Sequence, residues 1–117
     1  MHFEVEFYVS AAGSKPVEEF LDALERTDPN DARAVIAGIA KLRDRRNHHE
    51  PLSKSLGGGI YELRHVGKLN TRVLWFYRKA RRIVLLHGVR NKSQKIDKSD
   101  LKTALDRAAD WKARYPE

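Results

Sequence analysis

Apolar and polar side chains alternate along the first nine residues of the chain. The apolar positions are Phe3, Val5, Phe7 and Val9. A period of two is typical of a strand with one buried face, so the chain is predicted to open with a strand. Residues 16–46 change to spacings of three and four, which are typical of amphipathic helices.

The helical pattern is interrupted once, which predicts two helices in succession. Ser14 is a candidate N-cap for the first helix, just before Pro16. Asp28 is a candidate N-cap for the second helix, with Pro29 at its first position, and the periodic pattern continues to about Arg46. We therefore expect a helical hairpin after the first strand.

The second half of the chain has the composition of a small sheet. Residues 47–59 contain a proline, two serines and three consecutive glycines, and we predict a loop there. Three runs rich in branched and aromatic residues follow, and they predict an antiparallel meander. These runs are 60–65, 71–78 and 83–89. The last run is apolar without alternation, so we place it inside the sheet, beside the first strand.

A final amphipathic pattern predicts a helix from Ser99 or Asp100 to just before Pro116. The predicted order is β-α-α-β-β-β-α, an α+β fold with a small, mostly antiparallel sheet. We expect residues 1–117 to form a single domain, since this length suits one hydrophobic core.

Charge is placed unevenly along this pattern. Residues 41–95 hold 15 lysines and arginines against three acids, whereas residues 1–40 hold three basic and eight acidic side chains. A basic block of this kind is typical of nucleic-acid binding. The absence of cysteine and of a long apolar run favours a cytoplasmic protein that does not contact membranes.

Three segments carry a family resemblance: Lys54–Arg64 with its Tyr-Glu-Leu-Arg motif, Arg72–Phe76, and Ile83–Lys95 with Leu-Leu-His-Gly. Together they resemble the RelE/ParE toxin superfamily, specifically its HigB-like, phage-derived branch. The branch commonly continues its last strand as Gly-Phe-x-Lys-Lys followed by Thr-Pro. This chain departs from that pattern with Gly-Val-Arg-Asn-Lys over 88–92 and Ile96-Asp97.

The resemblance implies a RelE-like fold and a type II toxin of a toxin–antitoxin system. Such a toxin is an endoribonuclease, or mRNA interferase, that cleaves messenger RNA on the ribosome, usually in the A site. It is silenced by a cognate, helix-turn-helix (HigA-like) antitoxin, and we expect oligomers only through that complex. No cofactor is expected.

Metal-free cleavage of RNA uses the neighbouring 2′-hydroxyl as nucleophile, so a site must move protons and stabilise extra phosphate charge. Arg64 and Arg72 are the first candidates for charge stabilisation. If the turn between them centres on Lys68, they face one another on one side of the sheet. Glu62 could act as a base or hold an arginine, and we favour the second role.

His87 is the candidate for acid–base work, on the strand face we assign to Ile83, Leu85 and Val89. A buried histidine bonded to a backbone carbonyl is the structural alternative. Lys92 is the other catalytic candidate, so the proton-transferring group is either His87 or a lysine.

The remaining candidates are RNA-binding residues. Lys54, Arg90 and Lys95 could reach the sheet face that carries Arg64 and form a basic concave surface. Tyr61 could stack on a base, although Tyr61 and Trp75 fit a core role better. His48 and His49 are interpreted as solvated loop residues, and we assign no metal site.

Two other functions share this fold. Superfamily members resembling ParE inhibit DNA gyrase by binding, without cleaving RNA. The altered end of the last strand also allows an inactive remnant that only binds antitoxin.

Overall fold

The computed structural model describes residues 2–66, 70–91 and 95–117 as an α+β fold with three α-helices and a five-stranded mixed sheet. The strands are β1 (Glu4–Phe7), β2 (Ser53–Gly57), β3 (Ile60–Val66), β4 (Asn70–Arg78) and β5 (Arg82–Asn91). The helices are α1 (Pro16–Thr27), α2 (Pro29–Lys41) and α3 (Lys98–Arg114), with a short 3₁₀ turn, η1, at Arg45–Asn47. In these described ranges, no helix is long and apolar enough to cross a membrane.

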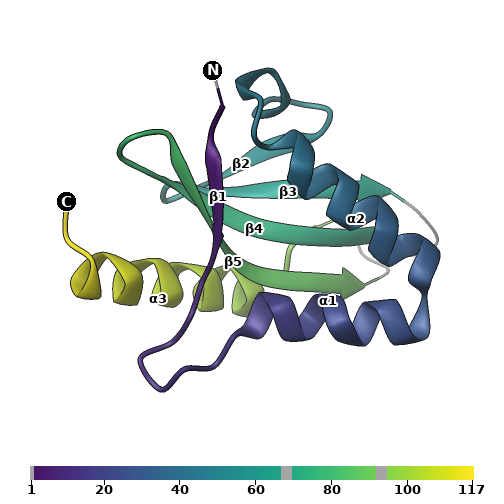
Figure 1. Ribbon diagram of the computed structural model, residues 1–117, viewed down its shortest axis with the longest axis horizontal. Coiled ribbons are helices and arrows are strands. Elements are labelled where there is room, and N and C mark those ends of the chain that lie inside the picture. Colours follow the sequence, from purple (N-terminus) through teal and green to yellow (C-terminus); the bar gives the residue numbers. More distant parts are fainter. Residues whose placement is uncertain (1, 67–69, 92–94) are drawn as a thin grey trace.

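The sheet has the strand order β1-β5-β4-β3-β2 (Figure 1). Strands β2 to β5 form an antiparallel meander, and β1 pairs with β5 in parallel, with Val5 opposite Ile83. The mostly antiparallel sheet is therefore confirmed, and so is the predicted place of the last strand beside the first. Helices cover both faces of the sheet, so the continuous apolar run of the central strand β5 is buried on both faces.

The predicted loop over 47–59 is partly wrong, because Ser53–Gly57 forms the edge strand β2. Its sequence, Ser-Lys-Ser-Leu-Gly, has none of the β-branched and aromatic residues by which the other strands of the meander were predicted, and several of its residues are exposed. Gly57, Gly58 and Gly59 all have positive φ and make the tight turn from β2 into β3. The glycines thus form a hairpin turn whose positive φ values would strain most other residues.

The helix boundaries follow the sequence with two corrections. Asp28 caps α2 as predicted, since its side chain accepts a hydrogen bond from the Asp31 amide at 3.2 Å. The cap of α1 is Lys15 and makes no side-chain hydrogen bond, so the prediction for Ser14 was wrong. Helix α2 ends at Lys41, before the predicted Arg46, and the chain continues into η1.

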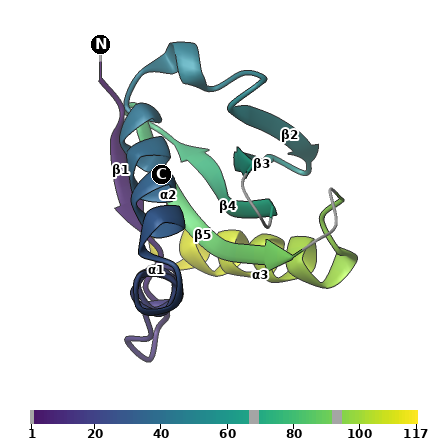
Figure 2. The same ribbon diagram turned by 90° about the vertical axis from the view of Figure 1, so that its right-hand side faces the viewer.

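The sheet is covered on both faces (Figure 2). Helices α1 and α2 pack on one face, whose core includes Leu63, Val73, Trp75, Ile83 and Leu85. Helix α3 packs on the other face through Ala104, Ala108 and Trp111, against side chains that include Leu74, Phe76 and Leu86. We call the face covered by the helical hairpin α1–α2 the hairpin face, and the face covered by α3 the α3 face.

A β-bulge in β5 decides which face its last residues occupy. Trp75 pairs with Leu85 and Leu74 pairs with His87, so the register skips Leu86. Leu86 and His87 therefore both lie on the α3 face, as expected when an extra residue enters one strand. The prediction that His87 shares a face with Ile83 and Leu85 was wrong, because those two side chains belong to the hairpin face.

Gly88, next to the bulge, lies directly under α1. A Cβ atom added to Gly88 would overlap the Phe20 ring, whose Cε2 would be 2.7 Å away. We expect Gly88→Ala to lower the free energy of unfolding by about 1–3 kcal/mol, the usual cost of overpacking a core. Chemical denaturation would measure this. Gly38→Ala is the control, because its Cβ would meet Leu63 at an ordinary 3.4 Å; equal losses in both variants would contradict the prediction.

Candidate nucleic-acid interface

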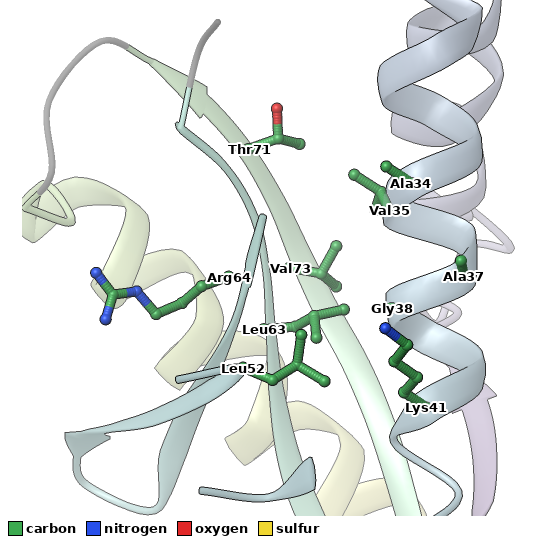
Figure 3. Close-up of a pocket in the computed structure, with 10 residues that line it drawn as sticks. All are labelled: Ala34, Val35, Ala37, Gly38, Lys41, Leu52, Leu63, Arg64, Thr71 and Val73. Carbon is green, nitrogen blue, oxygen red and sulfur yellow. The ribbon is translucent and has the colours of Figure 1, made fainter. Parts of the chain in front are cut away.

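Arg64 and Arg72 are cross-strand neighbours at one end of the α3 face. Their Cα atoms are directly paired, and Val66 pairs with Asn70, so the predicted register is confirmed. Figure 3 shows Arg64 pointing away from α2, whereas Leu63 and Val73 point toward it and line an apolar cavity of about 300 Å³. The alternation along β3 thus separates the guanidinium from that cavity.

Glu62 forms ion pairs with both arginines. Its Oε1 lies 3.4 Å from Arg64 Nε, and its Oε2 lies 3.4 Å from Arg72 Nε. The Glu62 and Arg72 side chains are only 3% and 2% exposed, whereas Arg64 is 27% exposed and also pairs with Glu50 at 3.6 Å. Burial raises the pKa of Glu62 above its ordinary value, against the opposing effect of Arg72, Arg64 and Lys54.

A cavity of about 550 Å³ opens beside Glu62, between the β2–β3 hairpin and the start of α3; we call it the α3 cavity. Its lining residues are Lys54, Leu56, Glu62, Lys95, Ile96, Asp97, Lys98 and Leu101. Lys54 is exposed on β2 directly opposite Glu62. The predicted pair Lys54 and Lys95 therefore lines one cavity, together with Lys98, which the sequence reasoning did not single out.

His87 lies on the same face and is held by α3. Its Nε2 is 2.8 Å from Asp100 Oδ1, and its Nδ1 is 3.2 Å from Arg107 Nη1. A guanidinium can only donate, so Nδ1 accepts and Nε2 carries the proton donated to Asp100. Both ring nitrogens of His87 are therefore hydrogen-bonded to side chains of α3. The structural alternative, in which a backbone carbonyl holds the ring, was wrong.

Asp100 and Arg107 were missed from the sequence. They lie seven residues apart, two turns of α3, on the side that also carries Ala104, Ala108 and Trp111. Polar residues within an apolar helical stripe are a usable signal, because a buried stripe accepts them only when they are paired. Arg107 Nη1 also donates to the Leu86 carbonyl at 2.8 Å, and burial lowers the pKa of Arg107.

Arg90 and Tyr61 lie on the opposite, hairpin face. Arg90 Nη2 contacts Asp28 at 2.7 Å, and its Nε lies 3.3 Å from Asp31, which ties β5 to the start of α2. Tyr61 stacks on Trp75 with ring centroids 4.8 Å apart. The structure therefore does not bring these two residues together with Arg64, and Lys92 lies outside the described residues.

His48 is buried, so its interpretation as a solvated loop residue was wrong. Its side chain is 5% exposed and contacts the rings of Phe3, Trp75 and Tyr77. Nε2 lies 2.6 Å from the Leu42 carbonyl and must donate to it, so Nδ1 accepts from the Tyr77 hydroxyl at 2.8 Å. A histidine with both nitrogens satisfied can serve as a core residue.

This burial predicts a pH dependence of stability. Desolvation lowers the pKa of His48 below its ordinary value. Below about pH 6.5 the unfolded chain therefore binds a proton that the folded chain does not, and stability falls with falling pH. We expect His48→Gln to reduce the drop in melting temperature between pH 7 and pH 5, measured by circular dichroism. The exposed neighbour provides the control: the prediction fails if His49→Gln has the same effect.

The α3 face therefore combines fixed positive charge with one buried carboxylate. Lys54, Lys95 and Lys98 line the α3 cavity. Arg64 and Arg72 both pair with Glu62, which lines the same cavity. Guanidinium and ammonium groups arranged around a cavity suit a phosphate-bearing ligand. His87 adds a titratable group two residues along β5 from the partner of Arg72, Val89.

Comparison with known proteins gives one family. The sequence profile described as "Phage derived protein Gp49-like" matches residues 19–109, which is most of the chain. That match includes β2 to β5 and α3 as far as Ala109, and so it includes Glu62, Arg64, Arg72, His87 and the residues that line the α3 cavity. No curated protein matches the sequence.

Proposed function

Since the chain belongs to the Gp49-like family of phage-derived proteins, within the RelE/ParE-like toxin superfamily, we propose that it is a toxin that cleaves messenger RNA on the ribosome. The observation that carries this proposal is the arginine pair on the α3 face, joined by Glu62 beside a lysine-lined cavity. Cleavage without a cofactor needs positive charge fixed where the phosphorane forms, and this face supplies it.

Each residue has a distinct part in the proposed reaction. Arg64, the more exposed guanidinium, contacts the scissile phosphate and stabilises its developing charge. Arg72 is buried and acts through position, since it and Glu62 fix one another beneath Arg64. Lys54 and Lys95 bind flanking phosphates along the α3 cavity. Positioning of the RNA supplies much of the acceleration, as it does wherever reactants are held in order.

We propose that either His87 or a lysine transfers the proton, and Lys92 remains a candidate from the sequence alone. For His87 to exchange a proton with RNA, its bond to Asp100 or Arg107 has to be replaced by one to the substrate. Both partners belong to α3, so the proposal requires the Asp100 or Arg107 side chain to move when RNA binds.

The proposed partner is a helix-turn-helix (HigA-like) antitoxin. The α3 face is basic, so an acidic or helical segment laid across it would cover Arg64 and the lysines of the α3 cavity. A stable complex of this kind buries about 1,200–2,000 Å².

Induction of the chain in a bacterial host, with mapping of messenger 5′ ends during growth, tests the proposal. Growth arrest with new 5′ ends is the expected result, and Arg64→Ala, present at equal level, should produce neither. Growth arrest with intact messenger would overturn cleavage in favour of a binding toxin. Absence of any arrest would leave the antitoxin-binding remnant.

One observation favours the second candidate, a ParE-like protein that binds and inhibits DNA gyrase. Both nitrogens of His87 are engaged by α3, which is what a structural histidine requires and a free acid–base group does not. Under this alternative the basic α3 face binds an acidic surface or nucleic acid without chemistry. Inhibition of DNA supercoiling by purified gyrase would distinguish it.

A further inference from the structure

A second basic cavity lies at the other end of the sheet from the α3 cavity, and nothing above assigns it. It has a volume of about 470 Å³ and lies between η1, the start of the chain and the β4–β5 hairpin; we call it the hairpin-turn cavity. Its lining residues are Phe3, Arg45, His48, His49, Tyr77, Arg78 and Arg81. Figure 1 shows this turn at the opposite end of the sheet from the ends of β3 and β5.

The two cavities are also on different faces. Tyr77 is five residues after Arg72 on β4 and therefore points to the hairpin face, about 17 Å along the strand. A ligand group in one cavity consequently cannot be the group held in the other.

An aromatic wall gives the hairpin-turn cavity a fixed shape. The Tyr77 hydroxyl donates to His48 Nδ1 at 2.8 Å, and His48 is itself bonded to the Leu42 carbonyl. Phe3 meets His48 edge-on with ring centroids 4.8 Å apart. Tyr77 is nevertheless 37% exposed, so a large ring held in one orientation remains open to a ligand. Exposed aromatic rings held in this way are the platforms on which single-stranded bases stack.

Three arginines also line the hairpin-turn cavity. Arg45 is exposed and lies over the Phe3 ring, 5.6 Å from its centroid. Arg81 is exposed at the hairpin turn. Arg78 Nε lies 3.5 Å from Glu117 Oε1. Among the described residues that line the cavity, none carries a carboxylate. The net charge of the lining is therefore positive, which suits a phosphate group.

The turn that presents Arg81 has an unfavourable backbone. Ala80 and Arg81 have φ values of +60° and +52°, a region where asparagine and glycine are the usual residues. An alanine and an arginine in succession at these positions cost stability that Asn-Gly would not. An arginine therefore occupies a position where glycine would be less strained, which is consistent with a use for its side chain.

We propose that the hairpin-turn cavity binds one nucleotide of single-stranded RNA, with the base stacked on Tyr77 and the phosphate held by Arg45 and Arg81. This rests on the proposed function only in taking RNA as the ligand. The cavity would hold a stretch of RNA away from the cleavage site, and so it adds affinity and does not take part in the chemistry. Stacking makes the site tolerant of base identity, because every base has an aromatic face.

Fluorescence anisotropy with a labelled, 2′-O-methylated single-stranded RNA tests this, because that probe cannot be cleaved through its 2′-hydroxyl. In 0.1 M salt the loss of one phosphate contact is expected to weaken binding about fivefold, so Arg45→Ala with Arg81→Ala, which together hold one phosphate, should weaken it about fivefold. The control is Arg46→Ala, which removes one positive charge next to Arg45. Arg46 itself does not line the cavity and pairs with Asp44. It should change affinity less than twofold.

Three further variants distinguish an effect of the cavity from effects of net charge and of folding. Tyr77→Phe should keep the affinity, whereas Tyr77→Leu should lower it with no change in net charge. Arg81→Gly should raise the melting temperature and still weaken RNA binding. The proposal is overturned if Arg46→Ala weakens binding as much as Arg45→Ala, or if the double variant binds RNA normally. The proposal is also overturned if the double variant loses antitoxin binding but keeps RNA binding, because the cavity would then be a protein-binding site.

These outcomes are independent of cleavage. If the wild-type chain binds the probe through this cavity but cuts no messenger, the proposed nuclease fails and the binding site stands. If the chain cuts messenger and the double variant binds the probe normally, the proposed nuclease stands and the binding site fails.

Discussion

Replacement of Glu62 by leucine is expected to lower the free energy of unfolding by about 3–5 kcal/mol, the typical cost of removing one member of a buried ion pair. Glu62 and Arg72 are both almost fully buried, and their closest charged atoms are 3.4 Å apart. Without the carboxylate, the Arg72 guanidinium stays buried and loses its negative partner. Denaturation by urea, followed by circular dichroism, would measure the loss.

Two further variants show whether the effect arises from a buried charge. Glu50→Ala removes the other carboxylate near Arg64, but that side chain is 67% exposed, so stability should change by no more than about 0.5 kcal/mol. The double variant Glu62→Met with Arg72→Met replaces the pair by apolar groups and should recover most of the stability lost in Glu62→Leu. A double variant as unstable as the single one would refute the explanation.

Arg64→Ala is expected to lower the rate of messenger cleavage by about 10²–10³-fold, the usual cost of removing one group that stabilises transition-state charge. The fold should be little affected, because Arg64 is partly exposed and its ion pairs are 3.4 and 3.6 Å long. The measurement is single-turnover cleavage of a messenger in programmed ribosomes, with melting temperature recorded for the same samples.

Two other arginine variants serve as controls for Arg64→Ala. Arg33→Ala removes an exposed arginine on α2, on the other side of the sheet, and should leave the rate unchanged. Arg64→Lys keeps the charge but loses the planar fork that contacts two phosphate oxygens, so its rate should be intermediate. If Arg64→Ala cleaves at the wild-type rate, the cleavage site is not at the arginine pair.

Most of the fold followed from hydrophobic periodicity, because periodicity reports burial. The alternation from Phe3 onward and the helical spacing before Trp111 come from elements with one buried face, and both were found. The edge strand β2 was missed for the same reason: with a partner on one side only and little buried surface, it leaves no periodic signal. Helix α2 was predicted too long because Leu42, its C-cap, is buried and continues the apolar pattern.

The candidate site was predicted less well, since it depends on irregularities. The Arg64–Arg72 pairing follows from regular alternation across a turn, and the prediction held. The β-bulge at Leu86 shifted His87 to the α3 face, and no local sequence signal marks a bulge of this kind. Arg90, four residues after Leu86, follows the shifted alternation, so its side chain meets Asp28 and Asp31 on the hairpin face.

The parallel pairing of β1 with β5 has a consequence for synthesis of the chain. Val5 is made early, but its partner Ile83 emerges much later, after every other strand of the sheet. The first strand must therefore wait unpaired until nearly the whole chain has left the ribosome, which is the slow, non-local kind of contact. A nascent chain that stops before residue 82 lacks the strand between β1 and β4, so it cannot complete the sheet that carries the arginine pair. The order of the strands thus delays completion of the proposed cleavage site until the last strand of the sheet has been made.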